Sequence, residues 1–193
     1  MTLLTLHPAE RSQAPALDTL TVAVTLELNH AAAATECVLS LRVQDAHAKV
    51  LWPKPAVCQA QDGLWQHTCL EWFLRRGERA YAEFNYSPSK AYAHYAFSDY
   101  RTRAEDPSLL PPQCEPSVQA GIYQLRVTQR LPYHVSWDMV GALTVVIETR
   151  SAERYHWARK HAPARADFHA SDSWLLLSEF AEPAAVTQPI HHS

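Results

Sequence analysis

The chain has 193 residues, and its 17 lysine and arginine residues against 20 aspartate and glutamate residues give a formal net charge of −3. This slight acidity excludes the basic surface of a nucleic-acid-binding protein, so no nucleic acid partner is expected. No apolar run reaches the roughly 18 residues of a membrane-spanning helix, so no membrane partner is expected either. The length favours one domain, which we place at residues 1–182.

The N-terminal segment bears on the cellular location and, through it, on the cysteines. Residues 1–8 contain no lysine or arginine ahead of a short apolar stretch, which does not match a secretory signal, so we expect a cytoplasmic protein. The four cysteines show no C-x-x-C spacing, and in a reducing compartment they are expected to be free thiols. Residues 183–193 are expected to form a disordered tail.

Apolar and polar residues alternate along most of the chain, which is the pattern of half-buried β-strands. In the clearest case, every second residue from Leu20 to Leu28 is leucine or valine. The 13 scattered prolines oppose long helices, and the 6 tryptophans and 8 tyrosines favour sheet. About nine strands are predicted, over residues 2–6, 20–28, 37–43, 68–75, 81–86, 92–97, 122–130, 142–149 and 174–180.

Turn-forming residues separate these segments. Asp62-Gly63, Arg76-Gly77-Glu78 and Ser87-Pro88-Ser89 have the composition of turns. Four prolines in residues 106–116 predict a long loop, and the alanine-rich residues 29–36 predict a turn or two between strands.

The alternation predicts the fold class. A strand with one apolar face buries only that face, so several such strands must form two sheets packed against each other. We therefore predict an all-β, antiparallel two-sheet β-sandwich of immunoglobulin-like or jelly-roll type. Residues 68–75 differ because both faces are apolar, with Trp72 on one and Phe73 on the other. This strand is either central and covered, or it lines a pocket.

Several stretches of the chain carry a resemblance to known families. They are residues 64–74, 81–89, 95–101, 145–148, 155–158 and 166–169. Together they resemble bacterial DOMON-like domain proteins and, more distantly, family-9 carbohydrate-binding modules. The resemblance spans about residues 20–180. Its first block, residues 64–74, 81–89 and 95–101, is more specific than its second block, residues 145–148, 155–158 and 166–169.

The resemblance implies a β-sandwich whose relatives bind sugars or haem, and it implies no enzymatic activity. The chain departs from the family pattern at several points. Lys90 follows Ser-Pro-Ser where glycine is expected, and residues 161–167 lack the family's proline-containing pattern. Gln66-His67-Thr68 replaces the acidic pair of family 9. Because of this last change, no family-9 sugar or calcium ligand is transferred to this chain.

Aromatic and polar residues in these stretches form the candidate ligand site. Trp65 stands just before a strand, where its flat apolar ring can stack on a sugar or a planar cofactor. Neighbouring polar side chains can supply the few hydrogen bonds that a pocket needs. The candidate ligand-binding residues are Trp65, His67, Glu71, Asn85, Ser87, Tyr100, Arg101, Trp157, His161, Asp167 and His169. The competing interpretation is structural, with Trp65 closing the end of the sandwich and Asn85 and Ser87 holding a turn.

Two further chemistries deserve comparison with ligand binding. Glu71 and Glu83 lie on neighbouring predicted strands and could serve as the acid and base of a glycosidase, although charges on a strand face are commonly just solvated. A cluster near the C-terminus could bind a divalent metal, although its spacing follows no tight metal motif. That cluster consists of His156, His161, Asp167 and His169. Haem would need an axial ligand such as Met139.

The sequence therefore predicts a non-catalytic domain that binds a small molecule, with a carbohydrate or sugar derivative as the leading ligand. Haem or metal binding is the alternative, and no cofactor is assigned. An enzyme ranks below both, because the chain has no G-x-S-x-G motif and only 4 isolated glycines, too few for a phosphate-binding loop. A protein-interaction domain with an exposed aromatic patch is a further alternative.

Overall fold

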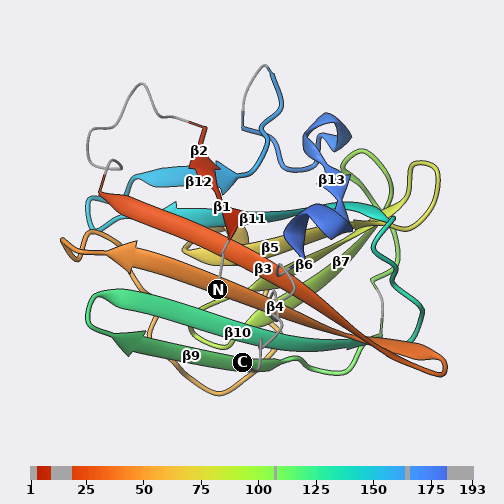
Figure 1. The fold of residues 1–193 in the computed structure, drawn as a ribbon, viewed down its shortest axis with the longest axis horizontal. Coiled ribbons are helices and arrows are strands. Elements are labelled where there is room, and N and C mark those ends of the chain that lie inside the picture. The colour runs from red at the N-terminus through yellow and green to blue at the C-terminus, as the bar shows by residue number, and fades with distance from the viewer. Residues whose placement is uncertain (1–3, 10–18, 107, 164–165, 182–193) are drawn as a thin grey trace, which may run out of the picture.

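The computed structural model describes residues 4–9, 19–106, 108–163 and 166–181, which form two antiparallel β-sheets packed face to face (Figure 1). The expected all-β sandwich is confirmed. These residues form thirteen strands instead of about nine. The four strands that were not predicted are His7–Pro8, Thr102–Arg103, Gln113–Gln119 and Arg154–Ala158. The described part of the chain contains short 3-10 helices but no α-helix, and no helix there is long and apolar enough to span a membrane.

The smaller sheet has five strands in the order β1-β3-β4-β10-β9. Their bounds are Leu4–Thr5 (β1), Leu20–Ala31 (β3), Ala34–Asp45 (β4), Gln113–Gln119 (β9) and Ile122–Leu131 (β10). The alternation predicted near the N-terminus is confirmed, since Val22, Val24 and Leu26 all lie in the core. The alanine-rich segment becomes the tight turn at residues 32–33 that joins β3 to β4.

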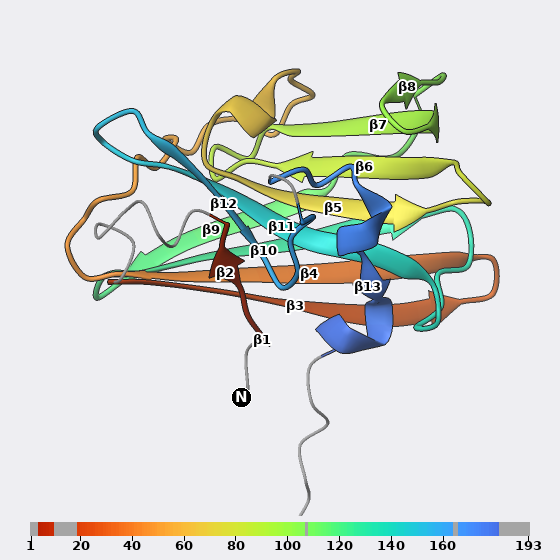
Figure 2. The ribbon, with the colours of Figure 1, turned by 90° about the horizontal axis from the view of Figure 1, so that it is seen from above.

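The larger sheet follows the order β2-β12-β11-β5-β6-β7-β8, and β13 pairs with β11 beside this path. The bounds are His7–Pro8 (β2), Cys69–Arg75 (β5), Tyr81–Tyr86 (β6), Tyr92–Asp99 (β7), Thr102–Arg103 (β8), Val140–Glu148 (β11), Arg154–Ala158 (β12) and Leu175–Leu176 (β13). Figure 2 shows β3 and β4 on one side of the molecule, with β6 and β7 on the other.

The larger sheet is covered on both faces. Toward the smaller sheet, Trp72 and Phe84 stack with ring centroids 4.9 Å apart within the main core. On the opposite face, Phe73 and Tyr81 belong to a second buried apolar cluster. A strand covered on both faces has no polar side to present to water, which explains why residues 69–75 do not alternate.

Two of the expected elements differ from the structure. Residues 106–116 were predicted as a loop, yet β9 begins at Gln113 and includes Pro116. A proline is tolerated there because β9 is the edge strand of its sheet and pairs only with β10 on its inner side. The strand β12 was not predicted at all, because its five residues are too few to show a clear alternation.

Residues 174–180 were predicted as a strand, which is wrong except for the short β13. The chain instead forms the 3-10 helices η3 (Ser171–Ser173) and η4 (Leu177–Phe180) on either side of β13. Leu177 and Phe180 both enter the main core, and their spacing of three residues fits a 3-10 turn. Alternation of apolar residues in such a short segment therefore did not distinguish a strand from a helical turn.

Two backbone positions constrain the chain around the larger sheet. Lys90 follows the Ser-Pro-Ser turn with φ 75°, a left-handed conformation that favours glycine. Gly141 lies in β11 where a Cβ atom would come within 2.3 Å of the carbonyl oxygen of Phe73. The glycine thus permits the close approach of β11 to β5 that closes the centre of this sheet.

The cysteines are free thiols, with Cys37, Cys69 and Cys114 buried and Cys58 exposed. The predicted opening strand is represented by β1, while Thr2 and Leu3 lie outside the described residues. The predicted disordered tail at residues 183–193 also lies outside them.

Candidate functional site

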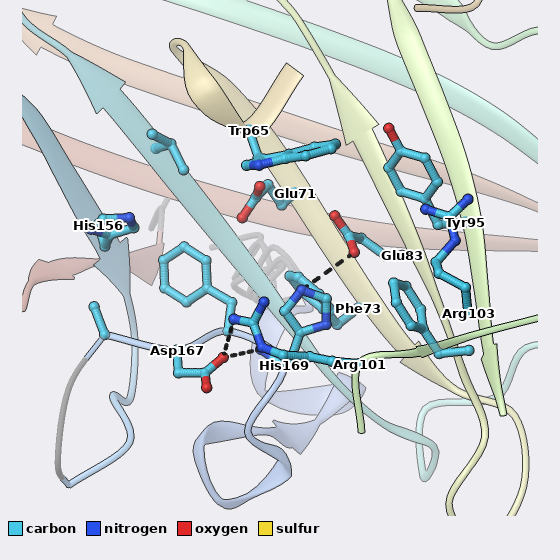
Figure 3. Close-up of a pocket in the computed structure, with 14 residues that line it drawn as sticks. Trp65, Glu71, Phe73, Glu83, Tyr95, Arg101, Arg103, His156, Asp167 and His169 are labelled. Carbon is cyan, nitrogen blue, oxygen red and sulfur yellow. Dashed lines mark hydrogen bonds and ion pairs between the residues drawn. The ribbon is translucent and has the colours of Figure 1, made fainter. Parts of the chain in front are cut away.

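A pocket of about 300 Å³ opens on the face of the larger sheet that points away from the smaller sheet (Figure 3). Its floor comes from β5, β6, β7 and β11. Its walls come from β8, β12, the 3-10 helix at residues 64–66 and residues 166–169. The lining residues are Trp65, Glu71, Phe73, Glu83, Tyr95, Phe97, Arg101, Arg103, Val146, His156, Ala166, Asp167, Phe168 and His169.

Strand register explains which side chains reach the floor. Along β5 alternate residues point to this face, so Glu71 and Phe73 enter the pocket while Trp72 enters the core. Phe73 is paired with Glu83 on β6, and Glu83 is paired in turn with Tyr95 on β7. One row across three strands therefore carries a phenyl ring, a carboxyl group and a phenol.

Aromatic rings form opposite walls of the pocket. Trp65 lies in the 3-10 helix η2 (Leu64–Gln66), is 40% exposed, and meets Tyr95 edge-on with ring centroids 5.8 Å apart. On the other side Phe168 lies 5.6 Å from the ring of His156. Trp174 fixes this second wall because its Nε1 donates a hydrogen bond to the Phe168 carbonyl oxygen at 2.8 Å.

Two buried carboxyl groups occupy the floor. Glu71 accepts a hydrogen bond from the Thr144 hydroxyl at 3.3 Å, and Glu83 accepts one from the Asn85 amide at 2.8 Å. Burial, together with the charge of Glu83, holds the pKa of Glu71 well above its usual value. Burial also raises the pKa of Glu83 to about 7, against the opposing effects of the Asn85 hydrogen bond and nearby arginines. The floor is thus a place where carboxyl groups retain protons near neutral pH.

His169 lies over the floor and is neutral. Its Nδ1 is hydrogen-bonded to the Tyr81 hydroxyl at 2.7 Å, and its Nε2 lies 3.7 Å from a Glu83 oxygen. Burial and the nearby positive charge of Arg101 lower the pKa of His169 to about 4. The Tyr81 oxygen already accepts a hydrogen bond from the Arg101 backbone N–H, so its own hydrogen is available to Nδ1. This arrangement leaves the ring proton on Nε2, facing Glu83.

The rim carries two arginines that are both neutralised by aspartates. Arg101 donates to Asp167 at 2.9 Å, and Asp167 also accepts a hydrogen bond from Tyr100 at 2.6 Å. Burial opposes the ionised form of Asp167, but these hydrogen bonds hold its pKa below the usual value. Arg103 donates to both oxygens of Asp106, at 2.8 and 2.7 Å.

Comparison with solved structures supports the fold. The chain resembles a "putative carbohydrate-binding protein" from Bacteroides uniformis with a TM-score of 0.56 and 13% identity, over 90% of this chain and 84% of that one. It also matches a family-9 carbohydrate-binding module from Caldicellulosiruptor kristjanssonii in complex with glucose, with a TM-score of 0.44 and 11% identity. This match covers 88% of this chain and 81% of that one. The same module in complex with cellotriose gives a TM-score of 0.42 at 12% identity, with 89% and 82% covered. No family model and no curated protein sequence matches the chain.

The structure brings together part of the predicted ligand site. Trp65, Glu71, Arg101, Asp167 and His169 all line the pocket. Two further predicted residues lie next to it and contact its members. They are Asn85, which donates to Glu83, and Tyr100, which donates to Asp167.

Four predicted residues do not reach the pocket. Trp157 points into the main core from the inner face of β12. His67 is largely exposed and is hydrogen-bonded to Glu148 at 2.8 Å, and the His161 ring donates to the His7 carbonyl oxygen at 2.8 Å. Ser87 accepts a hydrogen bond from the Ser89 backbone N–H at 3.1 Å, as the structural interpretation of this turn predicted.

Several lining residues were not predicted as ligand contacts, although the sequence held a signal for some of them. Once Glu71 is placed on the outer face, Phe73 follows by the period of two along the same strand. Tyr95 and Phe97 share a face of β7 in the same way. Arg103 and Phe168 gave no comparable signal, because they come from segments whose path depends on packing.

The metal site considered for the histidine-rich segment is not formed. His156, Asp167 and His169 line the pocket while His161 does not. In the ranges that the structure describes, no three His, Cys, Asp or Glu side chains are placed to hold a metal ion together.

Proposed function

We propose that this chain is a non-catalytic binding domain for a small, polar, ring-shaped ligand, with a sugar as the leading candidate. The observation that supports this proposal most is the pairing of aromatic walls with a polar floor in one pocket. Trp65 and Tyr95 offer apolar ring surface, while Glu71 and Glu83 offer hydrogen-bond acceptors. Stacking plus a few directed hydrogen bonds is how a small polar ring is held in a protein pocket.

The size of the pocket favours one sugar ring over an extended chain. A volume of about 300 Å³ is at the lower end of the range for ligand pockets. Deep side chains such as Phe73 and Glu83 are nearly fully buried, so the floor is accessible only to a group that enters from above. We therefore expect a monosaccharide, or the end of a longer saccharide.

The fold is consistent with this proposal. The Bacteroides uniformis protein, whose name describes it as carbohydrate-binding, shares the two-sheet fold over most of this chain. Membership of the DOMON-like group and a cytoplasmic location stay predictions.

The alternatives receive less support from the same pocket. Haem is a far larger and flatter ligand than a pocket of about 300 Å³ suits, and Met139 lies outside the lining residues. Glu71 and Glu83 could in principle act as acid and base, so the test of binding should also recover the sugar and ask whether it has changed.

Isothermal titration calorimetry with a panel of monosaccharides tests the proposal. We expect saturable binding by at least one sugar, which is recovered unchanged. Trp65→Ala should weaken binding by about tenfold or more through the loss of a stacking surface, while Trp65→Phe should retain part of the affinity. Val118→Ala is the control, since Val118 is 69% exposed on β9 of the smaller sheet. Flat titrations across the whole panel would contradict the proposal.

A further inference from the structure

The floor of the pocket has an excess of hydrogen-bond acceptors. Glu71 and Glu83 together present four carboxyl oxygens, to which Thr144 and Asn85 each donate one hydrogen bond. Next to the floor, the Asn85 Oδ1 is completely buried and receives no hydrogen bond from any residue in the described ranges, but Asn85 does not line the pocket. The two carboxyl groups do line it, so the floor suits a ligand that brings hydrogen-bond donors.

The charges around the floor are also unequal. At the rim, Arg101 and Arg103 form ion pairs with Asp167 and Asp106. Across the described segments, neither Glu71 nor Glu83 forms an ion pair with an arginine or lysine. The basic group that does approach Glu83 is His169, at 3.7 Å, and that ring is neutral near pH 7. Neither buried carboxyl group therefore has a positively charged partner in direct contact when it ionises.

We propose that the ligand carries a protonated amine, and that the pocket binds an amino sugar whose ammonium group contacts Glu71 and Glu83. This inference rests on the proposed sugar-binding function and specifies the chemical class of the sugar. An ammonium group supplies three donors and one positive charge, which are the two things that the floor lacks. A sugar hydroxyl in the same position supplies one donor and no charge.

The aromatic walls suit the same ligand. Figure 3 shows the carboxyl groups of Glu71 and Glu83 between the side chains of Trp65 and His169. An ammonium group there would lie among the aromatic rings of Trp65, Phe73 and Tyr95, whose faces attract cations. A cation removed from water needs paired charge as well, and the two carboxyl groups supply it.

Calorimetry with four probes at neutral pH tests this inference. The probes are D-glucosamine, D-glucose, N-acetyl-D-glucosamine and ethanolamine. We expect glucosamine to bind about tenfold or more tightly than glucose, because it forms charge-assisted hydrogen bonds that glucose cannot form. N-acetylglucosamine should lose this advantage because its nitrogen is uncharged, and ethanolamine should bind weakly because it has no ring.

Variants that remove one carboxyl group each show whether Glu71 and Glu83 cause the preference for glucosamine over glucose. Glu83→Gln and Glu71→Gln keep the size of each side chain and should each reduce the glucosamine preference several-fold, with a smaller effect on glucose. Glu115→Gln is the matched control, because Glu115 is an exposed glutamate on β9 in the other sheet. The raised pKa values mean that both glutamates retain protons near neutral pH in the empty pocket, and a protonated glutamate is uncharged. Glutamine is also uncharged and has nearly the same size, so these variants should remain folded.

Proton release provides a readout that a purely structural role would not produce. The raised pKa values of Glu71 and Glu83 mean that the empty floor retains protons near neutral pH, and an ammonium group should expel them. The binding heat of glucosamine should then depend on the ionisation enthalpy of the buffer, and that of glucose should depend on it much less. The charged and titratable groups that face Glu83 are Asp62, Glu71, Tyr81, Tyr95, Arg101, Arg103 and His169.

The outcomes separate this inference from the proposed function. If glucose and glucosamine bind equally, the amine inference is wrong and the sugar-binding function stands. If ethanolamine matches glucosamine, the pocket recognises a simple amine and the amino-sugar assignment is wrong. If another monosaccharide of the wider panel binds and glucosamine does not, the amine inference alone is wrong. If no sugar of the whole panel binds, both proposals fail.

Discussion

Glu71 and Glu83 lie on adjacent strands but in different rows of the sheet, since Glu71 is paired with Asn85 and Glu83 with Phe73. The two carboxyl groups are therefore diagonal neighbours on one buried face. Burial is the main cause of the raised pKa values of both carboxyl groups, and the charge of Glu83 raises the pKa of Glu71 further.

The contribution of Glu83 to the free energy of unfolding should fall with rising pH. Its pKa rises from 4.5 in the unfolded chain to about 7 in the folded protein, so the folded state binds this proton more tightly. The resulting stabilisation is present below pH 4.5 and is lost as the pH rises through about 7. Comparing the free energy of unfolding of the wild type and Glu83→Gln should show the wild type losing up to about 3 kcal/mol relative to the variant across this window.

The contribution of His169 to stability depends on pH in the opposite direction to that of Glu83, and it provides an internal control for the experiment. Its pKa falls from 6.5 to about 4 on folding, so its contribution is lost as the pH falls through that window. The Glu83→Gln variant should still lose the His169 contribution to the free energy of unfolding as the pH falls. Parallel stability curves for the wild type and Glu83→Gln would contradict the assignment of the raised pKa.

Asp167 should anchor the loop wall of the pocket. Asp167→Asn removes the ion pair with Arg101 and weakens the hydrogen bond from Tyr100, so we expect a loss of about 1–2 kcal/mol in the free energy of unfolding by denaturant. The control is Asp106→Asn, which breaks the more exposed ion pair with Arg103 and should cost less than about 1 kcal/mol. Equal losses in the two variants would contradict an anchoring role for Asp167.

Gly141 should tolerate no side chain. In Gly141→Ala the new Cβ would lie 2.3 Å from the Phe73 carbonyl oxygen, so β11 must separate from β5. We expect a loss of about 3 kcal/mol or more, measured by thermal unfolding, because the clash involves backbone that cannot rotate away. Gly77→Ala, where the nearest atom is the Ala80 Cβ at 3.8 Å, should change stability little, and a comparable loss there would argue against the steric explanation.

Replacing Lys90 by glycine should stabilise the folded protein. Its φ of 75° is unfavourable for a residue with a Cβ, so Lys90→Gly should raise the free energy of unfolding by up to about 1 kcal/mol. Lys54→Gly, at a lysine outside the left-handed region, should produce no such gain. A fall in stability for Lys90→Gly would mean that its side chain makes a contribution larger than the backbone strain.

The fold was largely predictable because alternation in the long strands reports directly on burial. Residues 20–28 show this best, since every second residue from Leu20 to Leu26 lies in the core. On the opposite face Thr21 is exposed, while Ala23 and Thr25 are buried as well. The prediction failed at residues 174–180, where apolar side chains three residues apart serve 3-10 turns. It also missed β12, which pairs with β11 across the short turn at residues 149–153, because its five residues are too few to show a clear alternation.

The pocket was only partly predictable. Trp65 and Glu71 were predicted because their local sequence places an aromatic ring and a carboxyl group at the start of a strand. Trp157 was predicted as a ligand contact but points into the core, since the face chosen by a residue of β12 depends on the register with its neighbour. Arg103 was not predicted, because its approach to Tyr95 at 4.2 Å requires the chain to turn back after β7.

Pro116 in β9 has a consequence for how copies of this protein meet one another. Its nitrogen carries no hydrogen, so a strand from another molecule laid along the free side of β9 would find a missing donor in the middle of the row. Such a strand could not continue the ladder past this point. We therefore expect β9 to discourage growth of the smaller sheet from one molecule into the next, which protects a concentrated solution of the protein from aggregation along this margin.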